Sequence, residues 1–305
     1  MEKSQKELLN KIADITDFPD GAYNIRVDGG SIGFKSTENI TIIPRPDKNG
    51  LEVHIKAGTK NESVHIPVII EQSGLKEVVY NDFYVGEDAD VIIIAGCGIH
   101  NESHSPSEHD GIHSFYLEKN ARLKYTEKHY GAGSNTSKRV FNPTTNVHLK
   151  ENSYMEIDTV QIEGVTDTKR VTTAVIEDNA SLVAHEKLMT DYDQYAHSEY
   201  NVELNGENSG THVVSRSVAK GKSKQIFVSK IDGNNKCSGH SECDAIIMGE
   251  SIVQAIPEIT ANHIDASLIH EAAIGKIAGD QIVKLMTLGL TESEAEKEII
   301  NGFLK

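Results

Sequence analysis

The chain has 305 residues, enough for one elongated domain or two compact ones. Its 46 acidic and 30 basic residues give a formal net charge of −16, which disfavours binding to nucleic-acid phosphates. The first twelve residues do not resemble a secretion signal, no apolar run approaches the roughly 18 residues of a membrane span, and the three cysteines are an odd number, so we expect a reduced protein of the cytoplasm.

The amino-terminal quarter of the chain predicts one helix followed by strands. Residues 2–13 are polar and amphipathic and predict a short helix. Between residues 23 and 80, short apolar or alternating runs such as 40–43 and 63–70 are separated by turn sequences rich in Gly, Asp and Asn. Tryptophan is absent, and Val, Ile and Thr are abundant through the middle of the chain, which favours β-structure with an aliphatic core.

A sequence repeat begins near residue 83. The segments 83–91, 115–123, 147–155 and 174–182 share a strand, a polar corner and a second strand. Their corner residues, Asp88, Asn120, Asn152 and Asn179, are of the types that tolerate the left-handed backbone conformation of a sharp turn. A unit this small cannot bury its apolar face alone, but stacked copies can. We therefore predict a β-solenoid over residues 80–255, with an ordinary antiparallel sandwich as the alternative.

The last forty residues change to helical patterns. We expect a helix over residues 265–288 with Gly289 as its C-cap. Thr291 and Glu294 form a capping-box pattern that opens a second helix over residues 292–303. The predicted division is an amino-terminal region over residues 1–75, a solenoid core over 76–262 and a helical carboxyl-terminal region over 263–305.

An ordered series of short sequences in the carboxyl-terminal third resembles the SufB/SufD family of iron–sulfur assembly scaffolds. The most specific is His-Glu-Ala-Ala-Ile-Gly-Lys-Ile at 270–277, and the series consists of segments 242–247, 255–259, 267–277, 280–281, 289–295 and 300–303. Upstream, Ile-Ala-Gly-Cys-Gly at 94–98 and the segment 117–125 are also similar to the family. The resemblance covers about residues 75–305 and is loose before them.

The resemblance implies a right-handed parallel β-helix with carboxyl-terminal helices, acting as a scaffold and not as an enzyme. It implies a dimer, with itself or a SufB/SufD paralogue, and a SufC-type ABC ATPase partner. A cysteine desulfurase would supply sulfur for a transient iron–sulfur cluster, and some assemblies of the family also bind a reduced flavin. The residues expected to dock the ATPase are Asp280, Gln281, Leu285, Gly289 and Leu290.

Two departures from the family pattern bear on the subtype. Longer SufB proteins carry an amino-terminal region, in many with a cysteine motif, whereas this chain has no cysteine before Cys97. SufD proteins usually lack the functional cysteine, but Cys243 and the pair His270 and Glu271 are present here. The chain therefore looks more like a short SufB.

The resemblance assigns Cys243, His270 and Glu271 as metal ligands. Thiolate, imidazole and carboxylate all bind iron, and such mixed ligation suits a cluster that must be released. The residues alone allow plainer interpretations. Cys243 could be a small buried apolar residue in a strand, and Glu271 could be a favourable charge near a helix amino terminus.

Three further positions are weaker candidates. The resemblance makes Cys97 a sulfur-accepting cysteine, and the flanking Gly96 and Gly98 would leave room around the thiol; a strand-end cysteine without a role is the alternative. Cys237 lies in a turn-rich stretch and could be an accessory thiol, but we expect an incidental exposed one. A histidine-rich loop, residues 100–113, offers ligands for a divalent metal, although loop histidines are often only solvated, and His113 falls at a family-like position.

Two alternative functions remain open from the sequence. The first is a SufD-like structural partner that stabilises the complex without ligating iron, with all three cysteines idle. The second is a carbohydrate-active β-helix enzyme, which would use paired acids such as Asp158 and Glu163, although no spacing singles these residues out.

Overall fold

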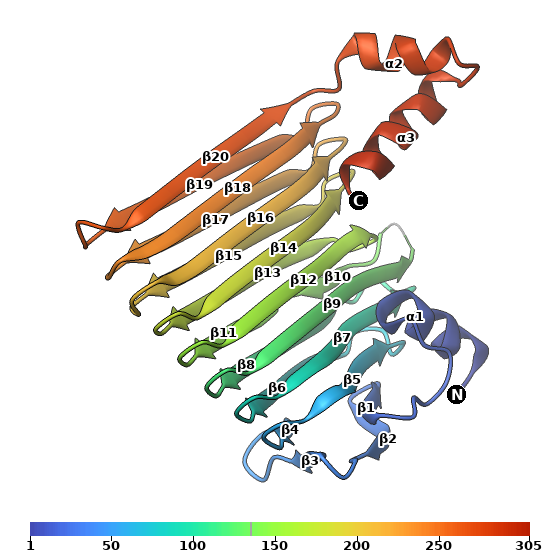
Figure 1. The fold of residues 1–305 in the computed structure, drawn as a ribbon. Coiled ribbons are helices and arrows are strands. Elements are labelled where there is room, and N and C mark those ends of the chain that lie inside the picture. Colours follow the sequence, from blue (N-terminus) through green and yellow to red (C-terminus); the bar gives the residue numbers. More distant parts are fainter. Residues whose placement is uncertain (135) are drawn as a thin grey trace.

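The computed structural model describes residues 1–134 and 136–305 as a solenoid of stacked strands with helices at its two ends (Figure 1). Each coil places one strand in each of two ten-stranded sheets, and neighbouring coils pair in parallel. The predicted parallel β-helix is therefore confirmed, and the antiparallel sandwich is not what forms. No helix among the described residues is both long and apolar enough to cross a lipid bilayer.

The strands of the two sheets interleave along the chain. In spatial order, sheet A contains β2 (Gly30–Lys35), β1 (Ala22–Val27), β5 (Lys60–Ile70), β7 (Asp90–Asn101), β9 (Arg122–Gly133), β12 (Tyr154–Glu163), β14 (Ser181–Thr190), β16 (Ser209–Ala219), β18 (Cys237–Ile247) and β20 (Ser267–Gly275). Sheet B contains β19 (Ile252–Ala261), β17 (Lys224–Gly233), β15 (Tyr195–Leu204), β13 (Asp167–Ile176), β10 (Arg139–Phe141), β8 (Ser107–Leu117), β6 (Lys76–Val85), β4 (Gly50–Ile55) and β3 (Ile40–Pro44), with β11 (Thr144–Leu149) between β13 and β8.

The coils turn at the corners that the repeat predicts. Asp88, Asn120, Asn152 and Asn179 all have a positive φ between 54° and 60°. Only small polar side chains and glycine adopt this conformation at low cost. Corner side chains also stack from coil to coil, as in the hydrogen bond of 3.0 Å that Asn120 Nδ2 donates to Asp88 Oδ1. The four corners therefore confirm the repeat.

The core lies between the two sheets, because alternate residues of each strand point inward. Strand β14, for example, buries every second side chain along its whole length. The main cluster of buried apolar residues runs from Ala22 near the amino terminus to Cys243 near the other end. Phe83 and Phe115 stack within it with ring centroids 4.7 Å apart.

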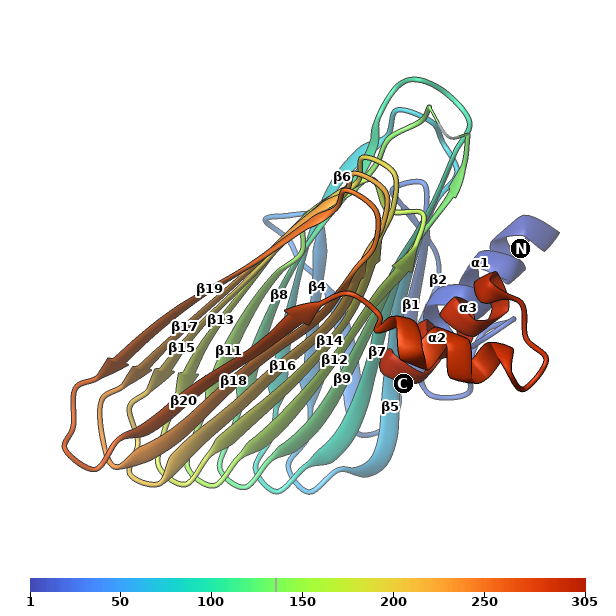
Figure 2. The same ribbon diagram turned by 90° about the horizontal axis from the view of Figure 1, so that it is seen from above.

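Helices cover the ends of several sheet A strands. Helix α1 (Lys3–Ala13) is predicted correctly and packs Leu8, Leu9 and Ile12 against the outer side of the sheet. Helix α3 (Glu292–Phe303) begins at the predicted Thr291 capping box. Its Ile300 contacts the cluster around Val218 of β16. Figure 2 shows the helices beside the ends of the sheet A strands.

The predicted helix over residues 265–288 is wrong in its first half. Residues Ser267–Gly275 form strand β20, and helix α2 spans only Gly279–Met286. Gly289, the predicted C-cap, has a φ of 99° but lies two residues beyond the actual C-cap, Thr287. Small and aliphatic residues fit either structure, and the in-register backbone hydrogen bonds to β18 decide for the strand.

The two ends of the solenoid differ. At the amino-terminal end, β2 and β3 pair antiparallel with β1 and β4 and cover the first coil. At the carboxyl-terminal end, the sheets stop at β19 and β20, and no further strand among the described residues pairs with either one. The last coil therefore has one open edge in each sheet and an uncovered inner face.

Candidate functional site

Cys243 lies on the inner face of β18, one coil from the open end. Its side chain is 1% exposed and belongs to the main apolar cluster. Ser215 of β16 and Ala272 of β20 are its register neighbours. Burial raises the pKa of the Cys243 thiol to about 12, and the charges of Glu186 and Asp244 act in the same direction. At neutral pH the isolated chain therefore holds this cysteine as a thiol.

His270 and Glu271 lie on β20 and not on a helix, so their side chains point to opposite faces of the sheet. His270 pairs with the inward-facing Ser241 and shares the inner face with Cys243. Glu271 is on the outer face, where its Oε2 lies 3.6 Å from Nε2 of His240. The single chain thus brings Cys243 and His270 to one face of the last coils, and it places Glu271 on the other.

His270 occupies the uncovered part of the last coil. Its Nδ1 is buried and has no hydrogen-bond partner among the described residues. Burial lowers the pKa of His270, and the neighbouring His240 adds to the effect. A neutral imidazole with a free nitrogen is the form that binds a metal or receives a proton.

Cys97 points into the solenoid from β7, and its side chain is 2% exposed. Burial raises the pKa of its thiol well above the ordinary value, with smaller contributions from Glu77 and Glu127. The sequence suggested that the flanking glycines leave room around the thiol, but they do not make it accessible. A Cβ on Gly96 would lie 2.5 Å from the carbonyl oxygen of Ile12, so this glycine allows α1 to pack closely on the sheet.

The interior beside Cys97 is polar. A cavity of about 10 Å³, room for no more than one water, is lined by Cys97, His109, His113, Glu127 and His129 among others. His113 Nδ1 lies 2.7 Å from the hydroxyl oxygen of Tyr125. Burial lowers the pKa of His113 to about 4, so its imidazole is neutral at physiological pH.

The predicted histidine loop is mostly strand. His100 is the second-last residue of β7, whereas His109 and His113 lie on β8 with buried side chains. His100 Nε2 is 3.0 Å from Glu102 Oε1, a local pair near the surface. Within the part of the chain that the structure describes, these histidines form no group of three metal-ligating residues. His109 and His113 share the inner face with Phe115, and this spacing in steps of two is the pattern of a strand.

A buried charged network was not predicted at all. The Arg170 guanidinium contacts Glu127 at 2.5 Å and lies 3.8 Å from Glu186, and all three side chains are at most 5% exposed. Glu186 also accepts hydrogen bonds from Ser198 at 2.5 Å and Ser215 at 2.9 Å. Although burial alone would raise it, Arg170 holds the pKa of Glu127 well below its usual range. A polar row thus runs from Glu127, one coil beyond Cys97, to Ser215, one coil before Cys243.

Cys237 differs from its prediction. It is the first residue of β18 and only 6% exposed, and it contributes to the main apolar cluster. Burial raises the pKa of its thiol. The turn before it covers only residues 234–236, so Cys237 is a buried strand residue and not an exposed thiol.

The predicted docking residues lie on and just after helix α2. Asp280, Gln281 and Leu285 are helical, whereas Gly289 and Leu290 belong to the turn that leads to α3. Helix α2 buries none of its residues. Apolar side chains stand exposed along it and its turn, with Val283 59%, Met286 43% and Leu288 76% exposed.

The acids named for a carbohydrate-active enzyme do not form a catalytic pair. Asp158 and Glu163 are five residues apart on β12, which along a strand is about 16 Å. Glycosidase carboxylates lie about 5–9.5 Å apart. Asp158 is bound to Lys124 and His185, and Glu163 lies 3.8 Å from Lys11.

Comparison with known proteins shows to which family the chain is similar. The family model described as "SUF system FeS cluster assembly, SufBD core domain" matches residues 72–303. An "Iron-sulfur cluster assembly SufBD family protein" of Archaeoglobus fulgidus is 31% identical over 264 residues, which are 85% of this chain and 69% of that protein. A relative in Methanocaldococcus jannaschii is 28% identical over 83% of this chain and 80% of its own.

Other relatives are longer than this chain. A SufBD family protein of Methanothermobacter thermautotrophicus is 28% identical over 78% of this chain, and the match spans 57% of that protein. The matched family model nevertheless covers the solenoid from β6 to β20 and both carboxyl-terminal helices. The chain belongs to the SufBD family of iron–sulfur cluster assembly proteins.

Proposed function

We propose that this chain is a SufB-like scaffold on which a transient iron–sulfur cluster is assembled together with a SufC-type ABC ATPase. The observation that carries the proposal is the position of Cys243 and His270, which share the inner face beside the uncovered end of the β-helix. A thiol and an imidazole at an end that a second chain can cover are suited to a site that forms and dissolves.

The pKa of Cys243 implies that the isolated chain is not yet ready to bind metal at this residue. Metal binding requires a thiolate, and a thiol with a pKa of about 12 is protonated at neutral pH. Glu271 lies on the opposite face of β20 from His270. In the proposed mechanism, the last coil rearranges when partners bind, and ATP hydrolysis by the ATPase drives this step. The rearrangement would bring Cys243, His270 and Glu271 to the same metal.

The partners would bind at two places. The exposed apolar side chains of α2 support an ATPase contact that includes Asp280, Gln281 and Leu285. The open edges of β19 and β20 support a dimer, with a second copy or a paralogue, because unpaired strand edges readily add another strand. Sulfur would arrive from a cysteine desulfurase at Cys97, and a reduced flavin bound to the complex would supply electrons.

One observation favours a second candidate function, that of a SufD-like partner that binds no iron. All three cysteines are buried, and burial raises the pKa of each thiol. If the last coil did not rearrange, these cysteines would stay protonated core residues. The chain would then contribute to the complex only the helices that bind the ATPase and the open strand edges that form the dimer.

The deciding experiment is reconstitution of the complex with the ATPase, followed by iron and acid-labile sulfide analysis. We expect C243S to lose most of the iron and sulfide. C237S is the matched control, because Cys237 is a buried cysteine on the same strand, and it should retain them. Full cluster loading in C243S would reject Cys243 as a ligand and support the SufD-like role.

A further inference from the structure

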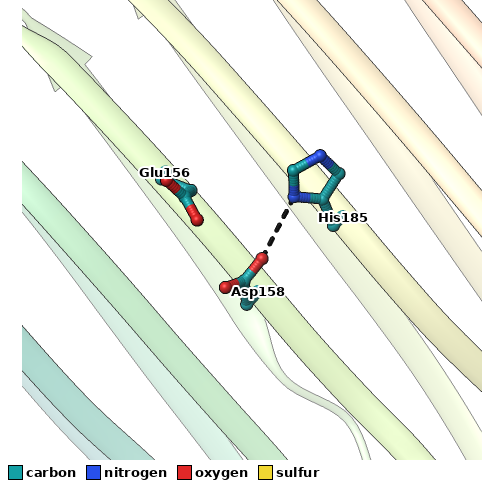
Figure 3. A group of neighbouring side chains, drawn as sticks. All are labelled: Glu156, Asp158 and His185. Carbon is teal, nitrogen blue, oxygen red and sulfur yellow. Dashed lines mark hydrogen bonds and ion pairs between the residues drawn. The ribbon is translucent and has the colours of Figure 1, made fainter. Parts of the chain in front are cut away.

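Three side chains with metal-binding groups meet on the outer face of sheet A, in the middle of the solenoid. Glu156 and Asp158 lie two residues apart on β12 and therefore point to the same side. His185 of β14 is the register partner of Asp158. Figure 3 shows the two carboxylates projecting from one strand and the imidazole facing Asp158 from the next. Regular strands hold all three, so their positions are fixed by backbone pairing.

The spacing of the three groups suits one cation. Each residue offers a ligand atom, and these atoms all lie within 4.8 Å of one another. His185 Nδ1 is 3.1 Å from Asp158 Oδ1. Adjacent ligands of an octahedral ion, each about 2.1 Å from the metal, are themselves about 3 Å apart. The imidazole and carboxylate are thus already at the separation of two neighbouring ligands.

A cation already lies between the two carboxylates. Lys124 Nζ is 2.6 Å from Glu156 Oε1 and 2.9 Å from Asp158 Oδ2. Although burial alone would raise it, these hydrogen bonds from Lys124 and His185 lower the pKa of Asp158. The lysine side chain is 45% exposed and can therefore swing into solvent. Ion pairs this exposed contribute little, and a divalent ion bound by three ligands can displace the ammonium group.

The cluster borders a groove that is open to solvent. The groove has a volume of about 500 Å³, and Asp158 and His185 line it together with His212 and Glu242. It offers entry for a hydrated ion and space for the water ligands that three protein groups leave unfilled. His212 also lines this groove, and its buried Nε2 has no hydrogen-bond partner among the described residues.

We propose that Glu156, Asp158 and His185 form an exchangeable site for a divalent first-row transition metal, which Lys124 occupies in the metal-free protein. Two carboxylates and one imidazole suit Mn²⁺ and Fe²⁺, unlike the thiolate at Cys243. A role of this site in holding ferrous iron before cluster assembly rests on the proposed function of the chain. The binding of a divalent metal at the site is independent of that function.

The test is a titration of the isolated full chain with Mn²⁺, followed by electron paramagnetic resonance of the free ion. Mn²⁺ prefers oxygen and nitrogen ligands, so the probe avoids the cysteines. We expect one bound equivalent, and H185A and D158N should each weaken binding by about 10-fold or more, at least the effect of losing an outer-shell partner. K124M should strengthen binding several-fold because it removes the competing ammonium group.

Two controls separate this site from its alternatives. His148 is an exposed histidine on β11 of the other sheet, so H148A should bind Mn²⁺ like the wild type. C243S should also bind normally, which would make the result independent of cluster assembly. The proposal is overturned if H185A and D158N bind Mn²⁺ as tightly as H148A, or if K124M binds it more weakly than the wild type.

Discussion

Individual buried residues show how this β-helix tolerates charge in its interior. Glu127 and Glu186 each accept hydrogen bonds, and the Arg170 guanidinium lies between them. An isolated buried carboxylate would be strongly unfavourable, whereas a paired one can be retained. His113 meets the same requirement in a different way, because its burial disfavours the charged imidazole and keeps the ring neutral.

His113 should make the folded chain sensitive to mild acid. Its pKa falls from the ordinary 6.5 to about 4 on folding, because burial disfavours the charged imidazole. Between pH 6.5 and 4 the unfolded chain binds a proton that the folded chain does not, so stability falls as the pH falls. The full loss from this group is about 3 kcal/mol at 1.36 kcal/mol per pH unit. Urea unfolding at several pH values measures it.

The matched variant for this prediction is H113Q, which keeps a polar side chain facing Tyr125 but does not titrate. We expect a smaller dependence of the unfolding free energy on pH in H113Q than in the wild type, whatever its stability at pH 7. If the unfolding free energies of H113Q and the wild type changed equally between pH 4 and 6.5, His113 would not be the source of this pH dependence.

The interior network could not be read from the sequence because its members come from different strands. Glu127 lies on β9, Arg170 on β13 and Glu186 on β14. Glu127 and Glu186 each stand two residues from an inward-facing apolar side chain, Tyr125 and Ala184, so they can share the inner face, but only the register of the coils places them beside Arg170. For the same reason, the family resemblance grouped Cys243, His270 and Glu271 but did not indicate that Glu271 lies on the opposite face of β20.

At the scale of elements, the corners were predictable and β20 was not. Asn and Asp at regular intervals have a specific conformational reason, which is their tolerance of positive φ. The segment Ser267–Gly275 contains small and aliphatic residues that satisfy a helical pattern equally well. Its strand conformation follows from pairing with β18, a long-range effect that local propensity does not contain.

The corner at Asn152 gives a test of this conformational argument. Its φ is 59°, which for a residue with an ordinary Cβ costs about 1–2 kcal/mol. N152A should therefore be less stable than N152G, since both variants lose the side-chain amide but only alanine is strained. Urea unfolding midpoints compare the two. A higher midpoint for N152A would mean that the left-handed backbone does not select the corner residue.

At the scale of the whole molecule, the two ends of the solenoid have different consequences. The antiparallel hairpins β1–β2 and β3–β4 cover the first coil, as a cap is expected to do in a repeat protein. The last coil instead presents the open edges of β19 and β20 and exposed isoleucines, including Ile259 at 41% and Ile274 at 38%. Exposed edges of this kind invite pairing with another chain.

If a second copy covers this end, a charge placed there should separate the copies. Ile274 is the register partner of the inward-facing Ala245, so I274K puts an ammonium group on the inner face of the last coil. Burying that group in an interface without a partner costs several kcal/mol. We expect the wild type to sediment as a dimer and I274K as a monomer. Ile92 is 44% exposed in the middle of the solenoid, on β7. The matched variant I92K should therefore remain dimeric, and equal dissociation of both variants would place the interface elsewhere on the molecule.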